Sequence, residues 1–146
     1  MRINLVYPER KTYESRKTWI TGLIEKAVDQ DPEKLDITNL FPQTEALMME
    51  LCQAFCAGNW LSTIILAQAT LEAELMEKDA LNSLTLNDIR YGRGYVWLRN
   101  RRNAIIHVTE SGPSVTAYDM TKDSHRLEND ARRAMELVVT SLLNRF

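Results

Sequence analysis

Apolar residues recur every three or four positions along most of the chain, the spacing that places side chains on one face of a helix. The pattern predicts an extended lead-in, helices over residues 13–29, 43–57, 60–81, 95–107 and 124–146, and a helical turn over 86–91. Residues 31–42 and 109–123 are expected to be loops. The sequence therefore indicates an all-α fold, an up-and-down bundle of four or five main helices plus a short helix.

The helix over 60–81 is expected to be the most buried element, because its apolar face is the widest. Gln68 and Glu72 lie one turn apart in the middle of that face. Gly58 is expected to end the preceding helix, since glycine adopts the left-handed conformation at little cost. No linker or repeat divides the chain, so residues 1–146 are interpreted as one domain. Residues 1–42 supply its lead-in and first helix, and 43–146 supply the remainder.

Composition is that of an ordinary folded protein, with 45% apolar residues and a formal net charge of -2. This charge creates no overall field that would attract nucleic acid or an anionic membrane. The chain lacks the run of about 18 apolar residues that a membrane span needs, and its start does not resemble a signal peptide, so we expect a cytoplasmic protein without membrane association. Cys52 and Cys56 are expected to be reduced and buried, and the two histidines are too few to predict a metal site or cofactor.

The helix over 95–107 mixes apolar residues with an unusual polar set. At about 100° per residue, Arg99, Asn103 and His107 share one edge. Trp97, Leu98, Ala104, Ile105 and Val108 are expected to face a core. Arg102 lies roughly 140° round the helix from His107. Either the helix unwinds at His107, or the arginine reaches round, or a second copy of the chain completes the pair.

These residue types suit the cleavage of RNA without a metal ion. Histidine takes and gives protons near neutral pH, so His107 would activate the ribose 2′-hydroxyl or protonate the leaving oxygen. Arg102 would neutralise the charge that builds on phosphorus, with Arg99 and Asn103 as supporting phosphate ligands. The alternative is structural, because histidine and arginine are also common at helix C-termini, where they complement the helix dipole.

The stretch "LRNRRNAIIHV" resembles the signature of HEPN domains, with Arg102, Asn103 and His107 in the signature positions. The upstream "FCAGNWLSTIILAQATLEAEL" is similar to the long helix that precedes the signature in that family, including a glutamate, here Glu72. The resemblance covers roughly residues 46–146. It implies a helical homodimer that acts on RNA, often as a metal-independent endoribonuclease in toxin–antitoxin, phage-defence or RNA-processing systems. Its catalytic residues would be Arg102 and His107.

The resemblance also implies partners, namely RNA, a second copy of the chain, and an antitoxin or regulatory protein. Toxins paired with a nucleotidyltransferase antitoxin often carry tyrosine two places after the histidine, where this chain has Thr109. That departure counts against this type of antitoxin. Many HEPN proteins serve as binding or dimerising modules, so the alternative function is a non-catalytic helical module that dimerises or binds a nucleotide or protein partner.

Two further features remain open at the level of sequence. Glu72 either orients His107 or Arg102 in a cleft, or is a buried partner of one arginine. Five arginines among thirteen residues, with aromatic residues between them, suit a nucleic-acid backbone and stacking bases. They equally suit core aromatics beside solvated or paired arginines. This run comprises Arg90, Arg93, Arg99, Arg101 and Arg102 with Tyr91, Tyr95 and Trp97, and His125 is expected to lie at the surface.

Overall fold

The computed structural model describes residues 3, 5–30, 40–79 and 92–143, and it confirms the all-α class. The helices in these residues are α1 (Arg10–Gln30), α2 (Pro42–Ala57), α3 (Trp60–Asp79), α5 (Arg93–Ile106), α6 (Ala117–Thr121) and α7 (Ser124–Leu143). The described residues contain one isolated β-bridge, between Thr109 and Gly112, and no strand. The helical turn expected over 86–91 lies outside the described residues.

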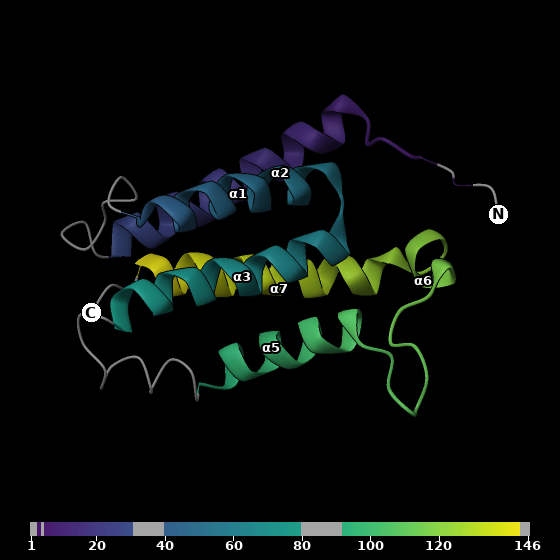
Figure 1. Ribbon diagram of the computed structural model, residues 1–146. Helices are drawn as coiled ribbons and strands as arrows, with labels where there is room; N and C mark the ends of the chain where they lie inside the picture. Colours follow the sequence, from purple (N-terminus) through teal and green to yellow (C-terminus); the bar gives the residue numbers. More distant parts are fainter. Residues whose placement is uncertain (1–2, 4, 31–39, 80–91, 144–146) are drawn as a thin grey trace.

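The five long helices form three layers (Figure 1). Helices α1 and α2 form the upper layer, α3 and α7 lie together in the middle, and α5 lies below them. Helix α3 packs against α2, α7 and α5, and α1 packs against α2 and α7. Because α3 has neighbours in all three layers, it is the central element, as its wide apolar face predicted.

Local chemistry explains the sharp turn between α2 and α3. Helix α2 begins at Pro42, whose fixed φ suits the first turn, and ends at Gly58, which has φ 76° and ψ 21°. A Cβ at Gly58 would lie 2.9 Å from Nη1 of Arg16, so both the backbone conformation and the space favour glycine. That Arg16 Nη1 donates a hydrogen bond to the carbonyl of Cys56 at 3.2 Å and so ties α1 to the turn.

The core is continuous from α1 to α7 and is made of large apolar side chains from every long helix. Phe55 is fully buried at its upper end, stacked on Trp19 with ring centroids 5.1 Å apart and edge-on to Trp60 at 5.5 Å. Aromatic pairs at these separations add to the stabilisation from area burial. Both cysteines are free thiols, as expected. Cys56 is buried, also as expected, but Cys52 is only half-buried.

Two predictions for the chain after α5 are wrong. Residues 109–123 are not entirely loop, because α6 forms there with a capping box. The Thr116 hydroxyl accepts from the Asp119 backbone, and the Asp119 carboxylate accepts from the Thr116 backbone. Val108 does not face the core and is 79% exposed. It lies beyond the helix, which ends at Ile106, so the angular pattern of a continuous helix no longer applies to it.

No helix within the described ranges is long and apolar enough to cross a membrane.

Candidate functional site

His107 lies just past the end of α5, with extended backbone angles (φ -123°, ψ 124°). Its backbone N–H still donates to the Asn103 carbonyl at 2.9 Å. The Ser114 hydroxyl, from the following loop, donates to the Ala104 carbonyl at 2.5 Å and so satisfies one of the last carbonyls of the helix. The His107 side chain is exposed and makes no hydrogen bond to any described residue. The helix therefore ends before His107, but this does not give the histidine a hydrogen bond to Arg102.

Arg102 points away from His107, towards α3. Its Nε donates to Oε1 of Gln68 at 3.1 Å, and its Nη1 donates to Oδ1 of Asn103 at 2.6 Å. Its other terminal nitrogen, Nη2, has no hydrogen-bond partner among the described residues. The guanidinium is thus fixed on one edge, and the remaining N–H groups stay available as donors.

Glu72 supports this arginine through an intermediate residue. Oε1 of Glu72 accepts a hydrogen bond from Nε2 of Gln68 at 3.0 Å and a second one from the hydroxyl of Tyr95. Neither bond reaches Arg102 or His107, so Glu72 makes no direct hydrogen bond to either of them in these contacts. We call the set Tyr95, Glu72, Gln68, Arg102 and Asn103 the polar network.

The polar network borders an open groove with a volume of about 630 Å³. Its walls come from α2, α3 and α5 and include Gln43, Leu47, Gln68, Ala69, Glu72, Ala73, Met76, Glu77 and Arg102. Ala69 and Ala73 leave space along α3. Two carboxylates and one guanidinium give the groove mixed charge, in place of the purely basic surface expected along a nucleic-acid backbone. His107 is not among its lining residues.

The other arginines of the basic run do not join Arg102. Arg101 Nε forms an ion pair with Asp130 of α7 at 2.8 Å, and Arg99 and Arg93 are exposed. Arg90 and Tyr91 lie outside the described residues. Tyr95 is buried and Trp97 packs against the core, which supports the structural interpretation of these aromatics. Among the described arginines of this run, Arg102 is therefore the one that borders the groove.

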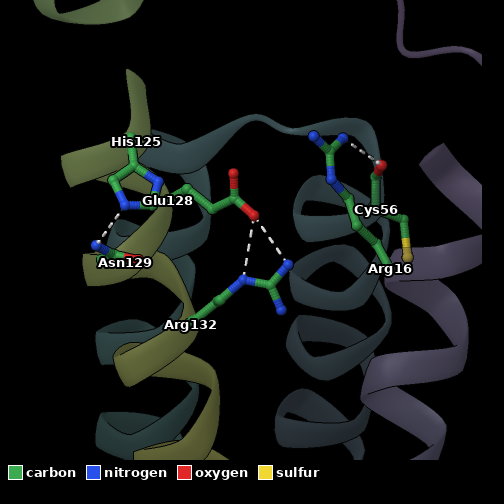
Figure 2. Close-up of polar contacts among 6 residues, drawn as sticks. All are labelled: Arg16, Cys56, His125, Glu128, Asn129 and Arg132. Atoms are coloured by element: carbon green, nitrogen blue, oxygen red, sulfur yellow. Dashed lines mark hydrogen bonds and ion pairs between the residues drawn. The ribbon is translucent and has the colours of Figure 1, made fainter. Parts of the chain in front are cut away.

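A second group of polar side chains lies at the end of the bundle where the α2–α3 turn meets the start of α7 (Figure 2). His125 is exposed, as expected, and its Nε2 lies 3.4 Å from the Asn129 amide nitrogen. Arg132 donates from Nε and Nη2 to Oε1 of Glu128 at 3.1 and 2.8 Å. This ion pair is internal to one face of α7.

Gln68 is the residue whose role the sequence did not reveal. Its place on the apolar face of α3, one turn before Glu72, is visible in the sequence and signals a buried polar partner. The sequence does not show which residue that partner is, because Arg102 follows 34 positions later on another helix.

Within the described residues, no group of three or more His, Cys, Asp or Glu side chains is placed to hold a metal ion. Comparisons with protein-family profiles, with curated proteins and with solved structures find no match to this chain.

Proposed function

We propose that this chain is a HEPN-like, RNA-acting protein that works as a homodimer and cleaves RNA without a metal ion, as part of a toxin–antitoxin or phage-defence system. The main support is the state of Arg102, a half-buried arginine anchored at a groove with Nη2 unpaired among the described residues. A guanidinium held in this way is oriented before a phosphate arrives, so binding loses little of its conformational entropy. The exposed His107, five positions later, supplies an imidazole accessible to solvent.

In the proposed reaction, His107 accepts the proton of a ribose 2′-hydroxyl, and the resulting oxygen attacks the adjacent phosphorus. The bond from phosphorus to the 5′-oxygen breaks, that oxygen takes up a proton from water as it leaves, and His107 returns the proton it accepted to the solvent. The products are a 2′,3′-cyclic phosphate and a 5′-hydroxyl. Arg102 donates to the phosphoryl oxygens on which negative charge increases. DNA lacks the attacking hydroxyl and is not a substrate on this route.

A second copy of the chain is part of the proposal because the two residues diverge within one copy. Arg102 is directed to Gln68 on α3, and His107 lies past the end of α5, where its side chain makes no hydrogen bond to the polar network. In a two-fold dimer, each site would combine Arg102 of one copy with His107 of the other. Such a site exists only when the copies associate, which makes activity depend on protein concentration.

The test is cleavage of single-stranded RNA in the presence of EDTA. Wild type should cleave, and His107→Ala and Arg102→Ala should each lower the rate by about a hundredfold or more. His125→Ala is the matched control, because His125 is also exposed but lies at the start of α7 and does not line the groove. Equal rates in wild type and His107→Ala would refute the catalytic role.

Mixing the two inactive variants tests whether sites are shared between copies. Heterodimers of Arg102→Ala and His107→Ala would contain one intact composite site, so an equal mixture should recover about a quarter of wild-type activity. No recovery despite subunit exchange would place each site within a single copy.

A second candidate function is a non-catalytic module that dimerises or binds a protein partner. It is favoured by the mixed charge of the groove, where Glu72 and Glu77 line the same walls as Arg102. These carboxylates weaken the attraction for a polyanion. A wild-type protein that is dimeric in sedimentation or light-scattering measurements, but neither binds nor cleaves RNA, would establish this alternative.

A further inference from the structure

Gln68 separates Glu72 from Arg102 within the polar network. We infer that Gln68 is a positioning residue that holds Arg102 in the groove wall while preventing direct ion pairing with Glu72, so that the arginine keeps its positive charge for an anionic ligand. This inference rests on the proposed function for the identity of that ligand, RNA, but its structural part does not depend on cleavage.

The hydrogen bonds allow only one orientation of the Gln68 amide. Arg102 offers only donors, and the ionised carboxylate of Glu72 offers only acceptors. The carbonyl Oε1 must therefore face Arg102 Nε, and the amide Nε2 must face Glu72, as found at 3.1 and 3.0 Å. The reverse orientation would oppose donor to donor and acceptor to acceptor. With 3% of its surface exposed, Gln68 has little water available to satisfy it in any other arrangement.

The charge arrangement is the functional part of the inference. A glutamate in place of Gln68 would also accept from Arg102 Nε, but it would neutralise the guanidinium by direct contact at low local dielectric. The glutamine carbonyl fixes the same edge of the guanidinium with a neutral dipole. Glu72 remains one residue further away, where Tyr95 and Gln68 both donate to it. Arg102 is thus oriented by the fold without being neutralised by a direct contact.

The decisive variant exchanges the two residues, Gln68→Glu with Glu72→Gln. The new glutamate at 68 accepts from Arg102 Nε and from the new amide at 72, whose oxygen accepts from Tyr95. The exchange therefore keeps the number of hydrogen bonds, the side-chain volumes and the net charge, and it only moves the negative charge into contact with Arg102. Gln68→Met removes the carbonyl at nearly constant volume, and Gln53→Met, at an exposed position of α2 that does not line the groove, is the control.

Two measurements separate positioning from charge. The first is the side-chain Nε–H signal of Arg102 in nuclear magnetic resonance, whose slow exchange with water reports the bond to position 68. The second is affinity for a 2′-O-methyl RNA oligonucleotide, which lacks the attacking hydroxyl and cannot be cleaved. The exchange variant should keep the protected signal and lose affinity about tenfold or more, the effect of neutralising one contacting cation. Gln68→Met should lose the protected signal and bind more weakly, and Gln53→Met should change neither.

Wild-type affinity in the exchange variant would overturn the role of charge, and a protected Arg102 signal in Gln68→Met would overturn the role in positioning. Failure of the proposed function looks different. In that case wild type does not bind the oligonucleotide, while the Arg102 signal still responds to position 68 as expected, which supports the anchoring role on its own.

Discussion

Two arginines in this protein have opposite surroundings. The guanidinium of Arg132 lies 4.7 Å from the ring centroid of Trp19 and 5.5 Å from that of Phe55, and it is paired with Glu128 (Figure 2). Arg102 has no aromatic ring or carboxylate in direct contact among the described residues. It is held by the neutral side chains of Gln68 and Asn103 at the edge of a groove.

The difference shows that two arginines of one chain can have contrasting roles, which their contacts in the folded structure distinguish. Arg132 has a structural role: its guanidinium packs on aromatic rings of α1 and α2 while its charge pairs with Glu128, and so it joins α7 to α1 and α2. Arg102 is fixed in orientation but not neutralised by contact, which is the state that ligand binding requires. We call Trp19, Phe55, Trp60 and Arg132 the aromatic cluster, and contrast it with the polar network.

The largest expected effect comes from removing the centre of the aromatic cluster. Phe55→Ala should lower the free energy of unfolding by about 3–5 kcal/mol, because Phe55 is fully buried and its loss leaves a cavity between Trp19 and Trp60. Chemical denaturation measures this, with the exposed Tyr118→Ala as control. A loss below about 1 kcal/mol would mean that the aromatic cluster does not hold the upper layer to the core.

The comparison itself is tested by the same substitution at both arginines. Arg132→Met should cost about 1–2 kcal/mol of stability, mostly from contacts with the two rings, because its ion pair with Glu128 is partly exposed and weak. Cleavage per folded molecule should not change. Arg102→Met should cost about 1–3 kcal/mol, because it leaves the buried Gln68 carbonyl unpaired, and it should also abolish cleavage. If the two variants had equal effects on cleavage, the distinction between the arginines would be wrong.

The smallest expected effect on stability comes from the half-buried thiol of Cys52, at high pH. Burial raises the pKa of the Cys52 thiol to about 11, with a further contribution from Cys56. Because the folded pKa lies above the unfolded one, the stability from this group is complete below about pH 9 and is lost as pH rises through about 11. Cys52→Ala should remove part of that alkaline loss, measured by denaturation at several pH values.

Alkylation kinetics give an independent check on Cys52. Since the thiolate is the reactive form, a shift of two pKa units should slow labelling about a hundredfold relative to the unfolded chain at pH 8. Labelling at the unfolded rate under native conditions would show that the pocket between α1 and α2, which Cys52 lines together with Ile20 and Met49, does not shield the thiol from water.

Much of the fold could be predicted because its signals are local. Helix α2 stops at Gly58 because only glycine accepts φ 76° there at little cost, and that residue is visible in the sequence. The candidate site was predicted less well. The helical angles predict that Arg102 and His107 diverge, a core position for Val108, which is exposed, and no role for Gln68, which bonds to Arg102. The error for Val108 arises because the helix ends at Ile106 and its angular pattern does not continue. The role of Gln68 depends on a residue of another helix, which the pattern of one helix does not reveal.

Helical periodicity and turn chemistry act over a few residues, so the sequence alone predicts the five long helices, their apolar faces and the position of Arg102 and Asn103 on one helix. The folded structure adds that Arg102 turns towards α3, that Gln68 stands between it and Glu72, and that His107 lies past the end of α5. The first two outcomes depend on side chains 34 positions apart meeting across a helix interface, where the need to satisfy buried hydrogen bonds selects the partners.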